Sequence, residues 1–192
     1  SAVAQTELPN SSGSDSELTF TDNELLLHGF EVGLSHENSV PPSGYEIHTF
    51  TTGDTFEITS GSGNVQYMII GGGGGASYDR AGGGGAGGFL TGNSTLSSGT
   101  YPITVGTGGL GGGKTGVDGG NSGVDSTFNG LTAYGGGRGG VNNFQAENGG
   151  SGGGANWEVS TVGTGISGQG NSGGVRDTGY PYRAGGGGGA GG

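Results

Sequence analysis

The chain of 192 residues has no cysteine, few cations and few large apolar side chains. Without cysteine it has neither a disulfide framework nor thiolate chemistry. Lysine and arginine together number 5 against 16 acidic residues, and none of the five precedes Arg80. Nucleic-acid binding needs a basic surface to neutralise phosphates, so we expect no nucleic-acid partner.

Long apolar stretches are also missing. No segment approaches the roughly 18 apolar residues of a membrane-spanning helix, and five cations offer little attraction to an anionic bilayer. We therefore expect no membrane partner. No convincing amphipathic helix is present either: residues 16–27 are a candidate, but 18–21 alternate as a strand does, and Gly29 and Gly33 interrupt the residues that follow.

Glycine is what the chain has in excess. Of its 55 glycines, 48 lie between Gly71 and Gly192, mostly in runs. Such runs are usually flexible linkers, and the low content of Leu, Ile, Val and Phe agrees with that interpretation. Three observations favour order instead: apolar clusters such as 67–70 and 89–90 flank the runs, proline is absent from them, and residues 80–192 carry five acids and five bases. We therefore predict an ordered glycine-rich domain.

The ordered form expected for these runs is the polyglycine II helix, with three residues per turn and a rise of ~3.1 Å. This helix has no internal hydrogen bonds, so each N–H and C=O must pair with a neighbouring helix. Side chains would hold such neighbours apart, which explains why alanine is the commonest interruption of the runs. The scaffold glycines predicted on this basis are Gly71, Gly72, Gly73, Gly74, Gly75, Gly82, Gly83, Gly84, Gly85, Gly185, Gly186, Gly187, Gly188 and Gly189.

Strand signals lie between the runs. Residues 45–50 and 55–59 alternate apolar and polar side chains, and the turn residues 51–54 between them predict a hairpin. Residues 64–70 and 100–105 predict two further strands. Asn129-Gly130 suits a type I′ turn and predicts a second hairpin from residues 126–128 and 131–134. The predicted fold class is all-β: short antiparallel strands and hairpins with a packed lattice of polyglycine II helices and essentially no α-helix.

We expect two domains, an acidic N-terminal arm at residues 1–43 and a glycine-rich β domain at 44–192. Residues 1–16 are polar and predict an extended arm, whereas 18–34 are apolar enough to need a partner surface. Three alternatives stay open for the arm: a mobile tail, a strand within its own domain, or a strand donated to a neighbouring subunit, which we favour slightly. The candidate assembly strand comprises Leu18, Phe20, Leu25, Leu27, Phe30 and Val32.

Catalytic patterns occur, but the glycine content explains them. Gly108 to Thr115 matches the phosphate-binding loop, yet the glycine-rich residues that follow do not support the helix that this motif requires. The nucleophile-elbow patterns around Ser151 and Ser172 likewise lack their strand–turn–helix context. All three histidines precede residue 50, and their spacing does not indicate a metal site. We predict no enzyme activity, no cofactor and no metal.

Residues 44–192 resemble the glycine-rich domains of bacteriophage tail-fibre and adhesin proteins. The resemblance rests on an ordered succession of blocks: Tyr45–Phe50, Val65–Ile70 running into Gly71–Gly75, Ala81–Phe89, Tyr101–Gly106, Gly119–Ser122, Thr132–Gly136 and Gly185–Gly192. In that family it implies a sandwich of polyglycine helices whose variable loops touch a host surface.

Recognition would then fall to loops between the runs, where side chains project. Tyr, Trp and Arg anchor many binding interfaces, and the candidates are Tyr78, Asp79, Arg80, Arg138, Trp157, Arg176, Tyr180, Tyr182 and Arg183. For Trp157 and Phe144 we favour the alternative that they cover the ends of the lattice.

Two functions are compatible with this sequence. The first is a structural, adhesive fibre domain, extracellular or on a virion surface, that binds a cell-surface glycan or protein. The second is a subunit of a self-assembling extracellular filament held together by N-terminal strand exchange. Both imply a homo-oligomer or filament.

Overall fold

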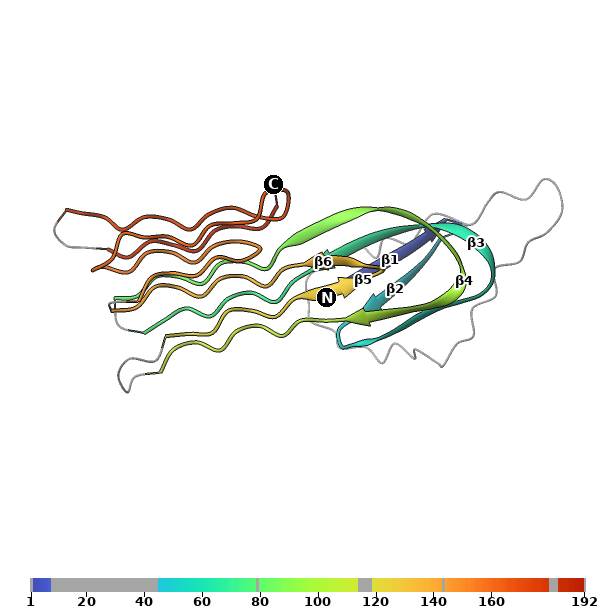
Figure 1. The fold of residues 1–192 in the computed structure, drawn as a ribbon, viewed down its shortest axis with the longest axis horizontal. Helices are drawn as coiled ribbons and strands as arrows, with labels where there is room; N and C mark the ends of the chain where they lie inside the picture. The colour runs from blue at the N-terminus through green and yellow to red at the C-terminus, as the bar shows by residue number, and fades with distance from the viewer. Residues whose placement is uncertain are drawn as a thin grey trace, which may run out of the picture.

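The computed structural model describes residues 2–7, 45–78, 80–113, 119–142, 144–179 and 183–191. These residues form an elongated molecule with a β-sheet at one end and a bundle of extended, roughly parallel glycine-rich segments at the other (Figure 1). The described residues contain no helix, so the all-β class is confirmed for them. None of their segments is a helix long and apolar enough to cross a membrane.

The sheet has six antiparallel strands: β1 (Ala2–Glu7), β2 (Tyr45–Phe50), β3 (Asp54–Ile70), β4 (Phe89–Thr104), β5 (Ser126–Phe128) and β6 (Leu131–Ala133). Their order in the sheet is β2-β1-β3-β4-β5-β6. The long strands β3 and β4 curve together around the end of the molecule, so the sheet folds back over itself (Figure 1). Their register shifts between Ile58 and Ser62, beside the positive φ of Gly61, and such irregularities bend a sheet.

The folded sheet encloses the apolar core. Phe56 and Ile58 from the first half of β3 pack in one cluster with Val65 and Ile69 from its second half, and all four are at most 2% exposed. The alternation of these residues along β3 is the period-two pattern of a strand with one buried face. The remaining members of the cluster are Leu96, Ile103, Phe128 and Ala133.

Of the two hairpins that the sequence predicts, one is confirmed and one is wrong. β5 and β6 pair across Asn129 and Gly130, whose φ values of 49° and 75° are both positive, as a type I′ turn requires. Residues 45–50 and 55–59 both lie in strands but do not pair with each other, because β1 lies beside β2 and the start of β3 pairs with β4. Alternation identifies a strand but not its partner.

The glycine run 71–75 continues directly from β3, and its hydrogen bonds repeat every three residues. The amides of Gly71 and Gly74 donate to the run 82–88 at 2.9 and 2.8 Å. The amides of the next residues, Gly72 and Gly75, donate instead to the segment 119–125, at 2.9 and 2.8 Å. Residues that are three apart in the run thus donate to the same neighbouring segment, and the residues that follow them donate to a different segment. This is the period of a helix with three residues per turn.

Carbonyl groups of the same run add two further neighbours. Gly73 and Ala76 accept from the segment 105–113, and Gly72 and Gly75 accept from the run 134–140. One glycine run is therefore bonded to four others in different directions, as a three-dimensional lattice and not as a sheet. The polyglycine II conformation itself stays a prediction, which this period supports.

The lattice is packed through main chain. A Cβ built on Gly74 would overlap the carbonyl of Gly137, and one on Gly85 would overlap the carbonyl of Ser151. The residues at the centre of the lattice, 135–137, 139–140 and 150–156, are buried although they carry little side-chain surface. Glycine is needed here because no other residue lets backbones approach so closely.

Candidate functional site

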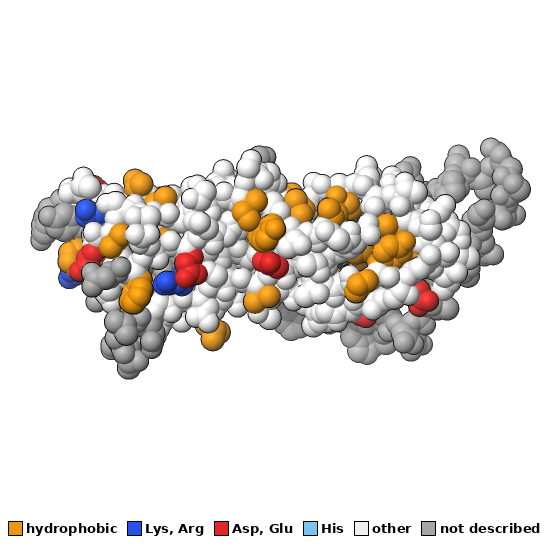
Figure 2. Space-filling view, viewed as in Figure 1, with side chains coloured by type: hydrophobic (Ala, Val, Ile, Leu, Met, Phe, Trp, Pro, Cys, Tyr) orange, Lys and Arg blue, Asp and Glu red, His pale blue; other side chains and the backbone are white. Residues whose placement is uncertain are grey.

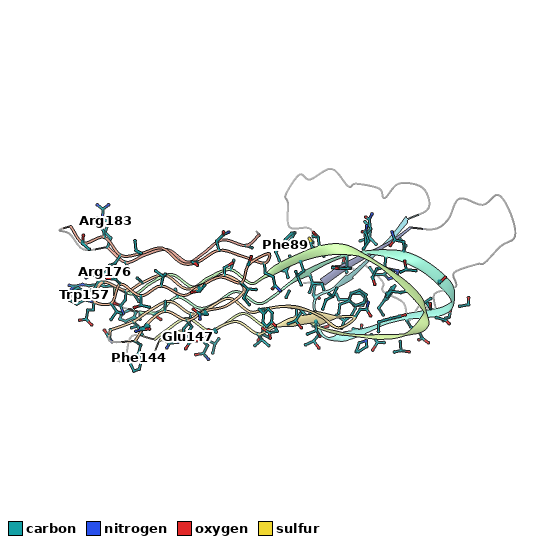
Figure 3. All side chains as sticks on the ribbon, turned by 45° about the horizontal axis from the view of Figure 1, so that its top comes forward. Phe89, Phe144, Glu147, Trp157, Arg176 and Arg183 are labelled. Carbon is teal, nitrogen blue, oxygen red and sulfur yellow. The ribbon has the colours of Figure 1, made fainter. Side chains whose placement is uncertain are left out.

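The loops that join the glycine-rich segments lie at the end of the lattice remote from the sheet (Figure 3). We call this end the tip and define it by the described residues 76–78, 80–81, 141–142, 144–146, 156–160, 175–179 and 183. The predicted recognition residues Tyr78, Arg80, Trp157, Arg176 and Arg183 belong to these loops. Arg138 lies in the run 134–140 next to them.

Two arginines from distant parts of the chain, Arg80 and Arg176, contact Trp157. The guanidinium carbon of Arg80 lies 5.2 Å from the centre of the indole ring, within cation–π range. The backbone amide of Trp157 donates to the carbonyl of Arg80 at 3.2 Å. Arg176 donates through Nη1 to the carbonyl of Trp157 and through Nε to Oγ of Ser160, both at 2.9 Å. Three tip loops are thereby joined at one aromatic residue.

Asn156, which is fully buried, fixes the loop that carries Trp157. Its Nδ2 donates to the carbonyls of Asn142 and Phe144 at 2.5 and 3.2 Å. Its Oδ1 accepts from the amides of Glu158 and Val159 at 2.8 and 2.6 Å. One side chain thus satisfies four backbone groups of two neighbouring loops, which makes it a positioning residue.

Arg138 forms the one ion pair between a cationic arginine and an acid in the described residues. Its Nε lies 2.7 Å from Oε1 of Glu147, while Oγ of Ser122 donates to Oε2 at 2.7 Å. The Ser122 hydrogen bond and the Arg138 contacts outweigh partial burial and lower the pKa of Glu147. The side chain of Glu147 is 48% exposed, so solvent screens this pair.

Apolar side chains remain exposed on the lattice half of the molecule (Figure 2). Phe144 and Tyr78 in the tip are 50% and 40% exposed, and Val175 is 70% exposed. From the sequence we expected Phe144 to cover an end of the lattice; half of this side chain stays exposed, and the covering role stays a prediction. The four arginines of the described residues also lie in this half, whereas the described strands carry none.

Several predicted residues lie outside the described part of the chain. These are Asp79, Tyr180 and Tyr182 among the recognition candidates, and the whole candidate assembly strand, Leu18, Phe20, Leu25, Leu27, Phe30 and Val32. Lys114 of the phosphate-loop pattern lies outside it as well. Their roles stay predictions.

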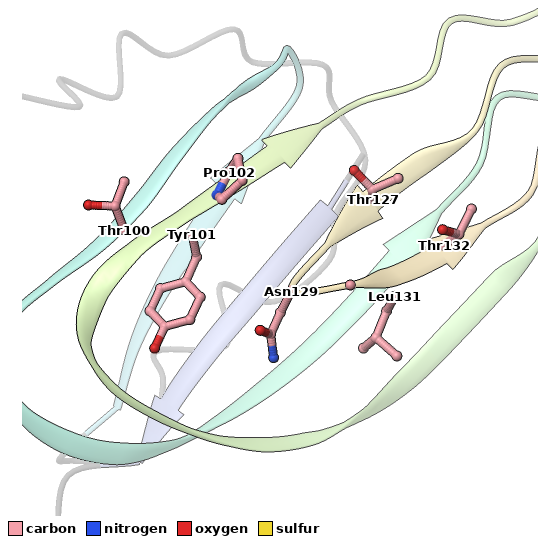
Figure 4. Close-up of a pocket in the computed structure, with 8 residues that line it drawn as sticks. Thr100, Tyr101, Pro102, Thr127, Asn129, Leu131 and Thr132 are labelled. Atoms are coloured by element: carbon pink, nitrogen blue, oxygen red, sulfur yellow. The ribbon is translucent and has the colours of Figure 1, made fainter.

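A groove lies on the sheet, away from the tip (Figure 4). It is lined by Thr100, Tyr101, Pro102, Thr127, Asn129, Gly130, Leu131 and Thr132. Two of its polar side chains already have partners: the Tyr101 hydroxyl donates to the carbonyl of Ser97 at 2.8 Å, and Nδ2 of Asn129 donates to Oγ of Ser94 at 3.1 Å. The groove carries no ionisable acid–base pair.

The serines of the two nucleophile-elbow patterns are used by the lattice. Ser151 is fully buried and donates to the carbonyl of Gly189 at 2.8 Å. Ser172 accepts from the amide of Gly165 at 3.3 Å. Within the described residues, no three His, Asp or Glu side chains are grouped as metal ligands.

Sequence reasoning identified the loops but missed Asn156 as the residue that positions them. An asparagine between alanine and tryptophan carries no distinguishing pattern, and its partners become visible only when residues 142–144 fold against it. The Arg80–Trp157 contact was missed for the same reason.

Comparison with known proteins gives one family. The family model described as a glycine-rich domain matches residues 49–192, from within β2 to the last residue of the chain. No curated protein and no solved structure matches the chain significantly. The family match covers about three-quarters of the chain and confirms the glycine-rich domain that the sequence predicts. The chain belongs to the glycine-rich domain family.

Proposed function

We propose that this protein is a non-enzymatic, adhesive fibre element of the bacteriophage tail-fibre type, in which the glycine lattice is a shaft that presents the tip to a cell-surface partner. Such a protein works outside the cell or on a virion surface. The proposal follows the resemblance of residues 44–192 to tail-fibre and adhesin domains, together with the arrangement of the tip.

The observation that carries the proposal is the Arg80–Trp157–Arg176 cluster at the end of a backbone-bonded lattice. Arginine and tryptophan contribute strongly to binding interfaces when their positions are fixed in advance. Here buried Asn156 and the surrounding lattice fix the backbone of the tip, so little ordering remains to be done on binding.

Exposure of apolar groups supports the same assignment. Tyr78, Phe144 and Val175, from three different tip loops, each leave apolar surface in water, and apolar surface of this kind can be buried against a partner. Catalysis is a poorer explanation of the chain, because the serines with a nucleophile pattern serve as backbone partners inside the lattice.

A glycan array tests the adhesive function. We expect the labelled wild-type protein to bind a restricted set of glycans, and Trp157→Ala and Arg80→Ala to weaken that binding at least tenfold. Leu110→Ser is the matched control, because this side chain is 75% exposed on the lattice outside the tip. Equal binding by the tip variants, or no binding to any glycan, would count against the adhesive function proposed for the tip.

The filament is the second candidate, and it is favoured by a separate observation. The N-terminal strand β1 is an interior strand of the sheet although 37 residues separate it from β2. The two candidates are compatible, since a filament subunit can also present a binding tip.

A further inference from the structure

The position in the sheet between β2 and β3, which we call the slot, takes one strand. We propose that in the assembled protein this strand is residues Ala2–Glu7 of a second copy of this chain. Each copy would give its own β1 to one neighbour and receive the β1 of another. The inference deepens the filament candidate above and does not depend on what the tip binds.

β1 completes the sheet on both of its sides. All six of its residues pair with β2, from Ala2 opposite Phe50 to Glu7 opposite Tyr45. All six also pair with β3, from Ala2 opposite Ile69 to Glu7 opposite Asn64. Without β1, the strand β2 would lose its partner in the described sheet and the second half of β3 would become an open edge. Unpaired edges of this kind bind another strand.

The strand is separable from the rest of the fold. The chain from Tyr45 onward supplies β2 to β6 and the lattice without interruption by β1. The family match likewise begins at residue 49 and does not include β1. The β3 side of the slot therefore lies within the matched domain, as do the last two residues of β2, whereas β1 lies outside it.

The length of the connection indicates where that strand comes from. Glu7 and Tyr45 are direct partners in the sheet, so their Cα atoms lie about 5 Å apart. Antiparallel neighbours joined within one chain usually need only two to five connecting residues. Residues 8–44 supply 37, which span up to about 120 Å when extended. A link of this length reaches the slot of a neighbouring molecule.

The geometry of such an exchange sets the form of the assembly. The donated strand and the receiving slot are different surfaces, so the contact is head-to-tail and repeats until it closes a ring or continues as an open chain. Each junction would contribute two rows of backbone hydrogen bonds. Self-association follows without any further interface.

Cysteine cross-linking of the full chain distinguishes the two sources of β1, because the natural sequence has no cysteine. Val3 and Thr49 are paired residues, and Thr49 is exposed, so Val3→Cys with Thr49→Cys places two thiols together on one face. The protein is assembled under reducing conditions, oxidised, and run on a denaturing gel. The control, Ala4→Cys with Thr49→Cys, moves one thiol to the opposite face of the sheet.

Strand exchange predicts a ladder of covalent multimers for the Val3–Thr49 pair and none for the control. A single band at monomer mass with an internal disulfide would overturn the proposal, because it would show that β1 fills its own slot. Failure to form any disulfide would also overturn it, since β1 would then not occupy the slot.

A second variant gives a readout without cysteine. Gln5→Pro removes a backbone donor in the middle of β1 and blocks pairing on one side. Exchange predicts that light scattering finds the wild type as multimers and this variant as folded monomers. An unchanged mass with only a lower melting temperature would contradict exchange between copies.

Discussion

The α-carbon of Gly84 faces the backbone carbonyl of Gly74, and a methyl group on Gly84 would overlap that carbonyl. The contact is backbone against backbone, so no side chain can rotate to relieve the overlap. Gly186, in another run of the same lattice, has open space where its Cβ would lie.

This pair gives a sharp test of main-chain packing. We expect Gly84→Ala to lower the free energy of unfolding by roughly 1–3 kcal/mol or more, since overpacking in a rigid interior displaces neighbours. Gly186→Ala is the control, and we expect it to be neutral or to stabilise slightly by restricting the unfolded chain. Denaturant unfolding of both variants checks this, and equal effects would contradict the packing.

Replacing Asn156 tests how the tip is held. Asn156→Ala removes the side chain that pairs with two carbonyls and two amides of the tip loops, although the carbonyl of Phe144 keeps the amide of Val141 as a donor. A polar group that loses its partner costs roughly 1–3 kcal/mol where it is buried. We expect a clear drop in melting temperature. Asn148→Ala is the matched control, because Asn148 is exposed and accepts one hydrogen bond, from Thr164. A smaller effect at Asn156 than at Asn148 would refute the positioning role.

Trp157 is the only tryptophan of the chain, so tryptophan fluorescence, excited selectively over the seven tyrosines, reports on the tip alone. We expect Arg80→Ala to change the emission maximum and intensity of Trp157, because a cation over the indole ring is removed. Arg138→Ala serves as the control, since this guanidinium pairs with Glu147 instead. Identical spectra for wild type and Arg80→Ala would show that the stacking is absent in solution.

The ion pair of Glu147 gives a pH dependence. The pKa of Glu147 is lowered in the folded protein, first by the Ser122 hydroxyl and then by Arg138, so the unfolded chain binds a proton more readily than the folded one. Its contribution to stability is therefore present above the usual glutamate pKa of about 4.3 and is lost as pH falls through the lower folded value.

Glu147→Gln should remove this part of the acid dependence, and Ser122→Ala should reduce it. Melting temperatures between neutral pH and about pH 3 would show the difference, which is small because the carboxylate is 48% exposed. A wild-type protein and a Glu147→Gln variant with parallel pH profiles would contradict the assignment.

Local patterns in the sequence predict local structure well. Alternation located the strand at residues 45–50, and Asn129-Gly130 specified a turn that the backbone torsions confirm. Both signals depend only on residues adjacent in the chain. The runs 71–75 and 82–88 were likewise recognisable as segments, because glycine without proline or excess charge favours order.

Pairing between distant segments was not predictable in the same way. The hairpin expected at residues 51–54 is wrong because Ala2–Glu7, which we interpreted as part of an extended arm, lies beside β2. Glycine runs carry no side-chain pattern. The sequence therefore does not indicate that the run 134–140 lies beside the run 71–75. The Arg80–Trp157 contact joins residues far apart and depends on that choice.

Amide hydrogen exchange of the glycine runs tests the central claim, that these runs form a backbone-bonded shaft. Gly74, Gly85 and Gly137 donate hydrogen bonds of 2.8, 2.8 and 2.9 Å to different neighbouring segments. We predict that their amides exchange as slowly as those of the core strand β3, because each opens only when the lattice opens. Exchange of these three amides at random-coil rates, while β3 stays protected, would show that the runs are flexible linkers.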